Sequence, residues 1–191
     1  MPRRISGGTK GFISAGRVSA TRRKPLLPTV YMLAGLVLMV ALDILLPAAR
    51  VLSFPWTLAG LGPLAIGAAL NIAADRAFKR HATAVKPFQP STSLVTEGVF
   101  GLSRNPMYLG MILILFGVSL LLGALTPFAM CVAFALLMHY RFVRVEERML
   151  AEQFGAEWQR YRARVRRWVQ ASELGGFPVP KPPTINASSV R

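Results

Sequence analysis

Two acidic side chains stand next to each other in the C-terminal third of a chain that contains few acids. Glu146 and Glu147 make up a quarter of the 8 Asp and Glu residues, whereas Lys and Arg number 23. Adjacent acids at the start of a helix are ordinarily first-turn residues that the helix dipole favours. Their scarcity in a strongly basic chain favours a second interpretation, in which Glu146 or Glu147 binds an ammonium group of a ligand.

A loop rich in proline and glycine is the second feature that could do chemistry. The segment 84–106 contains Pro87, Pro90, Gly98 and Gly101, so it is poorly helical. The loop lies between segments that, from their composition described below, span a membrane. Irregular backbone beside such a bundle of membrane helices must be buried in protein or line a cavity. We therefore expect this loop to wrap a pocket on the cytoplasmic side.

The end of this loop predicts an anion site. Pro106 suits the first turn of a helix, and Asn105 suits its N-cap. The N–H groups of such a helix start, beside Arg104, would attract a carboxylate or a phosphate. An anion there, an ammonium at Glu146 or Glu147 and a planar ring against Phe100 together match S-adenosylmethionine, which the residues alone leave as one possibility.

The composition indicates which elements position these residues. The chain is 53% hydrophobic and 16% charged, whereas soluble domains are about 25% charged. Four segments approach the roughly 20 apolar residues that span a bilayer, namely 29–46, 54–74, 107–125 and 127–143. A tight reversal around Gly123 makes the last two an antiparallel hairpin. The sequence therefore predicts an all-α integral membrane protein with about four transmembrane helices.

The basic residues predict an orientation. Seven of them precede the first span, five lie in the loop after the second and ten follow from Arg141 on, while Arg50 alone lies on the other side. By the positive-inside rule, both termini face the cytoplasm. This topology accounts for most of the net charge of +15 without a nucleic-acid partner. The single cysteine and two histidines also exclude a Cys-based or His-rich metal site.

The two ends of the chain differ in composition from the predicted membrane domain, 29–174. Residues 1–28 are basic and free of acids, which predicts a disordered cytoplasmic tail or, alternatively, an organellar transit peptide. Residues 175–191 are rich in proline and glycine, and we expect them to be disordered.

An amphipathic helix is predicted over about 146–170, after the fourth span. Apolar side chains recur there every three or four residues and form one stripe: Leu150, Phe154, Trp158, Tyr161, Val165 and Trp168. With its arginine flanks, the stripe fits a helix in the membrane interface and equally a helix packed on the bundle. Gly155 is a candidate break in this helix.

These motifs together resemble a known family. The sequence reads Leu94-Val95-Thr96-x-Gly98-x-Phe100-x-x-x-Arg104-Asn105-Pro106-x-Tyr108, then a hydrophobic hairpin, Glu146-Glu147 and Phe154-Gly155-x-x-Trp158-x-x-Tyr161. This pattern, over about residues 83–168, resembles the isoprenylcysteine carboxyl methyltransferases, which are related to the membrane phospholipid methyltransferases. The resemblance implies an enzyme that transfers a methyl group from S-adenosylmethionine to a lipophilic acceptor, such as a prenylcysteine-like carboxylate.

The resemblance also implies a role for each motif. The adenosine end of the cofactor would lie at Thr92, Leu94, Val95, Gly98 and Phe100, and its methionine end at Arg104, Asn105, Pro106 and Tyr108. Glu146, with Glu147 second, would bind the ammonium, and Arg141 or Arg144 would lie on the substrate side.

One residue departs from the pattern of the prenylcysteine enzymes. Those enzymes usually have His directly after the Arg that corresponds to Arg104, whereas this chain has Asn105. In this respect the sequence is closer to the phospholipid methyltransferases. The change removes a titratable group, which puts a proton-transfer role at this position in doubt. Two alternatives therefore stay open: a phospholipid or amine N-methyltransferase of the same fold, and a non-catalytic membrane protein that binds anionic lipid.

Overall fold

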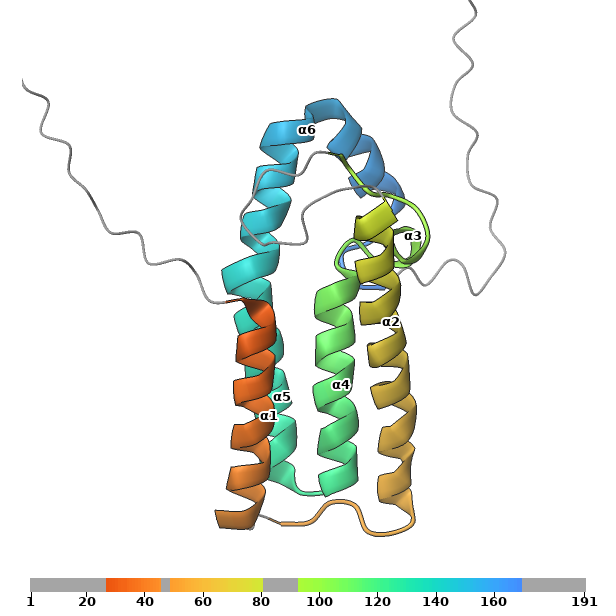
Figure 1. Ribbon diagram of the computed structural model, residues 1–191. Coiled ribbons are helices and arrows are strands. Elements are labelled where there is room, and N and C mark those ends of the chain that lie inside the picture. The colour runs from red at the N-terminus through yellow and green to blue at the C-terminus, as the bar shows by residue number, and fades with distance from the viewer. Residues whose placement is uncertain (1–26, 46–48, 81–92, 170–191) are drawn as a thin grey trace, which may run out of the picture.

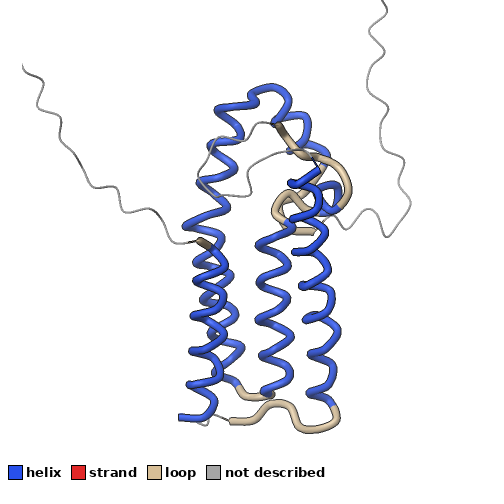
Figure 2. Tube along the Cα trace, viewed as in Figure 1, coloured by secondary structure: helices blue, strands red, loops and turns tan. Residues whose placement is uncertain are grey.

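The computed structural model describes residues 27–45, 49–80 and 93–169, which form helices and connecting loops without a β-strand (Figure 2). The main helices are α1 (Pro28–Leu45), α2 (Leu61–Arg80), α4 (Pro106–Leu122), α5 (Leu125–Met138) and α6 (Arg144–Arg164). Three short elements accompany them: the 3₁₀ helix η1 (Trp56–Gly60), the four-residue α3 (Val99–Leu102) and the π-helical turn η2 (His139–Val143). The prediction of an all-α fold is confirmed.

Within the described ranges, three helical segments are long and apolar enough to cross a membrane: Pro28–Leu45, Trp56–Arg80 and Leu125–Arg164. The fourth apolar helix, α4, is shorter at 17 residues. The helices do not end where the predicted spans end: α2 continues to Arg80, beyond 74, and α4 ends at Leu122, before 125. Hydropathy follows the apolar stretch, whereas the backbone hydrogen bonds of α2 continue into its polar last turns.

The helices α2 and α4 approach closely because glycines face each other along their contact. A Cβ built on Gly67 would lie 2.5 Å from the carbonyl oxygen of Gly110, and one on Gly117 would lie 2.6 Å from that of Gly60. Small residues are how membrane helices bring their backbones together. This contact fixes α4, which carries part of the site, against α2.

The predicted hairpin between α4 and α5 is confirmed, and it turns at Gly123. This residue has a φ of 69°, the left-handed conformation that glycine adopts without a steric penalty. Its carbonyl accepts the amides of Val51 and Leu52 at 2.8 and 3.0 Å, so the preceding loop is tied to the turn. The turn therefore closes the end of the bundle opposite the site.

The chain does not break between α5 and α6. The segment Leu125–Arg164 is one run of 40 residues that includes the π-helical turn η2 and a kink at Gly155. At about 1.5 Å per residue this run is about twice as long as a hydrocarbon core is thick. Its apolar first half, up to Val143, is the part that can span. The residues of α6 lie beyond the membrane-spanning segment.

The second half of α6 folds back over the bundle. Gly155 has a φ of 46°, so the helix bends there, at the break that the sequence suggested. Figure 1 shows α6 continuing α5, arching over the end of the bundle and descending beside α3. This arch brings the residues that follow α6 down to the start of α4. Helix α6 ends at Arg164, before the expected 170.

Candidate functional site

The candidate site lies where three segments meet at one end of the bundle. They are the loop that leads into α4, the first turn of α6 and the residues just after α6. The amide of Arg104 donates to the carbonyl of Arg166 at 3.1 Å, and the hydroxyl of Ser103 donates to the carbonyl of Arg167 at 3.2 Å. The segment after α6 is thus held against the loop, so that the cofactor motifs predicted from two distant parts of the sequence lie together.

Glu147 is the centre of an ion-pair network. Its carboxylate accepts the Nε of Arg167 at 3.1 Å and the Nη2 at 2.7 Å. Nη2 of Arg104 lies 3.5 Å from the same carboxylate, and Nδ2 of Asn105 donates to it at 3.3 Å. Glu147 is buried, and the hydrogen bonds to it raise the pKa of the Arg167 guanidinium. Both oxygens of Glu147 are therefore occupied by side chains of the protein itself.

Asn105 occupies the N-cap position of α4, but it does not cap the helix as predicted. Its side chain makes no capping hydrogen bond; instead, Nδ2 reaches Glu147 and, at 3.3 Å, the carbonyl of Arg167. The side chain is thus oriented by the two acceptors of its Nδ2, and its Oδ1 accepts no helix amide. Pro106 takes the first helical position as expected. Asn105 thus serves as a hydrogen-bond donor between two segments.

Arg104 has unused hydrogen-bonding capacity in a buried place. Its side chain is only 7% exposed, and its guanidinium lies 5.5 Å from the ring centroid of Trp158. Its Nε and Nη1 are buried and have no hydrogen-bond partner among the described residues. Burial lowers the pKa of Arg104, with the neighbouring Glu147 opposing that effect. Buried donors of this kind are normally satisfied, so Arg104 is a ready partner for an anionic ligand group.

Glu146 is in a different position from its neighbour. One of its oxygens accepts the hydroxyl of Tyr108 at 2.8 Å, across from α4 to α6. Burial raises the pKa of the Glu146 carboxyl to about 7, and the hydrogen bond from Tyr108 opposes that rise. Side chains of the protein bond both oxygens of Glu147, whereas the hydrogen bond that Glu146 accepts from Tyr108 is on one of its oxygens.

The residues predicted for the adenosine end lie in the same loop but are mostly packed. Val95 and Phe100 are buried in a cluster with Ala74 and Ala77, and Leu94 packs under Trp158. The Phe100 ring meets that of Phe78 edge to face, 5.0 Å between centroids. Gly98 is exposed and has a φ of 61° at the start of α3. Thr92, with the rest of 84–92, lies outside the described residues.

The apolar stripe of α6 packs on the protein. Trp158, Tyr161 and Val165 are buried against Leu94, with Leu150 and Phe154 at the edge. The hydroxyl of Tyr161 donates to the carbonyl of Phe100 at 2.7 Å. Of the two interpretations of this stripe, packing is the one that the structure supports. The stripe covers the loop and holds it in place.

The substrate-side candidates lie on the surface, and two residues of the network were not predicted. Arg141 and Arg144 are exposed, and the guanidinium of Arg144 lies 5.8 Å from the ring centroid of Tyr140. Arg167 and the Tyr161 hydroxyl were not predicted as site residues. Arg167 is hidden in the sequence among the arginines that flank the stripe, and the helical pattern does not reveal which of them turns inward after the helix ends.

Comparisons with known proteins agree with these motifs. The model of the phospholipid methyltransferase family matches residues 56–157. The chain is also similar to a solved structure of the eukaryotic intramembrane Ras methyltransferase ICMT, isoprenylcysteine carboxyl methyltransferase, with a TM-score of 0.56 and 23% sequence identity. That match covers 75% of this chain and 52% of the other, so the chain spans about half the length of that protein. No curated protein matches the chain.

Proposed function

The chain belongs to the phospholipid methyltransferase family, and on that premise we propose that this membrane methyltransferase uses S-adenosylmethionine to methylate a lipophilic acceptor. The observation that carries the proposal is the pairing of opposite, incompletely satisfied groups at the start of α4. Arg104 has two buried donors without a partner among the described residues, and the hydrogen bond that Glu146 accepts within the described residues, from Tyr108, is on one of its two carboxylate oxygens. An amino-acid head group, with one carboxylate and one ammonium, matches both.

The charges of the site support the same assignment. Arg104 and Arg167 carry two positive charges against the single negative charge of Glu147. The network therefore has an excess of one positive charge, which a ligand carboxylate would neutralise. Beside it, Glu146 in its ionised form would neutralise a ligand ammonium. We infer that Arg104 binds the carboxylate of the methionine moiety and that Glu146, rather than Glu147, binds its ammonium.

The residues around this head group would position the cofactor rather than react. When bound, S-adenosylmethionine supplies an electrophilic methyl group on its sulfonium sulfur. Methyl transfer gains most of its rate from holding the nucleophile in line and excluding water. Tyr108 orients the Glu146 carboxylate, and the covering arch of α6 with Trp158 shields the site. The adenosine end would follow the loop at Leu94, Val95 and Gly98.

The acceptor is proposed as a class. A carboxylate such as that of a prenylcysteine needs no general base, whereas an amine must lose a proton and needs an acceptor nearby. A phospholipid or other lipophilic amine is the second candidate acceptor. Asn105 favours it, because the sequence at this position is closer to that of the phospholipid methyltransferases. Arg141 and Arg144, on the exposed side of the helix, are candidates for contacts with an anionic acceptor. With the basic residues inside, the site and both termini would face the cytoplasm.

The experiment that tests this proposal measures cofactor binding. Purified protein in detergent is titrated with S-adenosylhomocysteine by calorimetry. Glu146→Gln is compared with Glu152→Gln, which removes an exposed acid from the same helix. We expect saturable binding that Glu146→Gln weakens at least tenfold and Glu152→Gln leaves unchanged. Absence of binding by the unaltered protein would contradict the enzymatic function, and equal affinity of the two variants would contradict the role of Glu146.

The acceptor class is then tested with labelled cofactor. A prenylcysteine, a phosphatidylethanolamine and an isoprenoid acid are offered separately, and labelled lipid is counted. Methylation of the prenylcysteine or the acid supports carboxylate transfer, whereas methylation of phosphatidylethanolamine alone supports the second candidate.

A further inference from the structure

A cavity opens between the last turns of α2 and the start of α3, at the same end of the bundle as the site. Its volume is about 580 Å³, within the size range of small-ligand pockets. Its lining consists of residues from the last turns of α2 and from the start of α3: Ala73, Arg76, Ala77, Lys79, Arg80, Gly98 and Val99. The small residues give it room, and none of the ion-pair network around Glu147 contributes to it.

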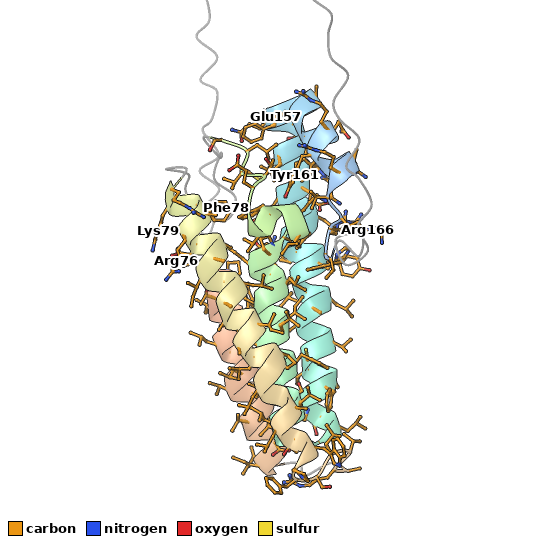
Figure 3. The ribbon with its side chains drawn as sticks, turned by 90° about the vertical axis from the view of Figure 1, so that its right-hand side faces the viewer. Arg76, Phe78, Lys79, Glu157, Tyr161 and Arg166 are labelled. Carbon is orange, nitrogen blue, oxygen red and sulfur yellow. The ribbon has the colours of Figure 1, made fainter. Side chains whose placement is uncertain are left out.

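The charge of this cavity is positive. Arg76, Lys79 and Arg80 all line it, and among the residues that the structure describes the only acid paired with one of them is Asp75, whose carboxylate lies 2.7 Å from the Lys79 nitrogen. Three cations against one acid leave a local charge of +2. Figure 3 shows Arg76 and Lys79 extending from α2 away from the bundle, while Phe78 points toward α3. The cavity thus offers guanidinium groups to an anion from outside.

The face of α2 that leads to the cavity is apolar. Ile72 is 52% exposed and Ile66 is 57% exposed, on a helix that is apolar and long enough to span the membrane. Ile72, Arg76 and Arg80 are spaced four residues apart, so they lie along one side of the helix. Acyl chains would contact the isoleucines while a headgroup at the end of α2 reached the arginines. A soluble anion would use only the second half of this surface.

We propose that this cavity binds the phosphate-bearing headgroup of an anionic phospholipid, with the acyl chains along Ile66 and Ile72. The ligand is recognised by its negative charge at Arg76 and Arg80 and by its apolar tail at α2. The arginines of this cavity are distinct from the ion-pair network around Glu147, which would hold the amino-acid head of the cofactor, while Gly98 lies at the border between the cavity and the proposed adenosine end. Its occupancy does not depend on methyl transfer.

Native mass spectrometry of the full chain in detergent tests the proposal. The protein is titrated with dioctanoyl phosphatidylglycerol, with dioctanoyl phosphatidylcholine and with inorganic phosphate, and bound adducts are counted. The variant carries Arg76→Gln and Arg80→Gln. The control carries Arg148→Gln and Arg160→Gln, which remove two exposed arginines of α6 outside the cavity. Since an interfacial Lys or Arg contributes about 1 kcal/mol toward anionic lipid, we expect the variant to bind phosphatidylglycerol about 30-fold more weakly.

Three results would overturn the proposal. Equal losses in the variant and the control would show general attraction to a basic protein. Equal affinity for phosphatidylcholine and phosphatidylglycerol would show that the charge is not recognised. Binding of inorganic phosphate as tight as that of phosphatidylglycerol would exclude a lipid site. S-adenosylhomocysteine affinity and the unfolding temperature of each variant verify that the bundle is intact.

Discussion

Replacement of Glu147 by Gln is the most informative single change at the site. Gln keeps the size of the side chain and removes its charge, so packing is preserved while the centre of the network is lost. Arg167 then loses the carboxylate oxygens 3.1 and 2.7 Å from its Nε and Nη2, and Arg104 loses the carboxylate 3.5 Å from its Nη2. Two guanidinium groups remain beside each other without a counter-ion.

The size of the effect follows from the burial of these partners. Removing one member of a buried ion pair destabilises a protein by about 3–5 kcal/mol. Arg104 is 7% exposed and feels nearly the full change, whereas Arg167 is 34% exposed and water compensates part of its loss. We therefore expect the lower end, about 3 kcal/mol. For a chain of this size, that corresponds to a decrease in unfolding temperature of roughly 6–12 °C.

Two measurements test this value. Thermal unfolding in detergent, at one scan rate, compares Glu147→Gln with Glu157→Gln, which alters an exposed acid of the same helix. Hydrogen–deuterium exchange then locates the change, because the amide of Arg104 donates to the carbonyl of Arg166. We expect faster exchange in 103–105 when the segment after α6 detaches, and unchanged exchange in the α2–α4 contact.

The double variant Glu147→Gln with Arg167→Gln isolates the charge imbalance. It leaves Arg104 as the single buried charge, so it should recover part of the lost stability. If Glu147→Gln and Glu157→Gln unfold at the same temperature with the same exchange pattern, the network does not hold the segment, and the reasoning is refuted.

Three further predictions concern the pH dependence and the packing. The pKa of Glu146 is about 7, and we propose that its ionised form binds the ammonium. Affinity for S-adenosylhomocysteine should therefore rise about tenfold per pH unit below pH 7 and level off above it, and Glu146→Gln should remove this pH dependence. A flat profile for the unaltered protein would contradict the proposed role of Glu146 in binding the ammonium. Gly67→Ala places a Cβ 2.5 Å from the Gly110 carbonyl and should destabilise by about 1–3 kcal/mol in thermal unfolding. Gly62→Ala, which meets nothing within 4 Å, should not, and equal behaviour would refute the close contact. Tyr161→Phe leaves the buried Phe100 carbonyl without its 2.7 Å hydrogen bond and should lower the stability by about 1–3 kcal/mol. Tyr140→Phe, at the surface, is the control and should have no such effect. Equal unfolding temperatures of the two variants would show that the Tyr161 hydrogen bond contributes nothing.

Much of the architecture could be predicted because the membrane imposes simple rules on the sequence. Apolar length located the spanning helices to within a few residues, except at the polar end of α2. Gly123 predicted the turn, and Gly155 the bend in α6, because each adopts a backbone conformation that other residues avoid. The two motifs on Arg104 and Glu146 were brought together by the topology of the hairpin, as expected.

The partners within the site could not be predicted from the sequence. Local sequence preferences predict that Asn105 caps α4. In the structure its side chain instead donates to Glu147 and to the carbonyl of Arg167, 62 residues along the chain. The inward turn of Arg167 depends on where α6 ends, which helical periodicity does not specify. The short α3 arises from its packing under the arch, against a local composition that disfavours a helix.

The length of α4 has a consequence for how an acceptor reaches the site. Its 17 residues rise about 26 Å, less than the roughly 30 Å of a hydrocarbon core. On the proposed function, we expect Tyr108, in the first turn of α4, to lie near the depth of the lipid carbonyls. An acceptor headgroup would then meet the site while its chains stayed among the other lipids, so that capture of the proposed acceptor would be lateral diffusion in two dimensions.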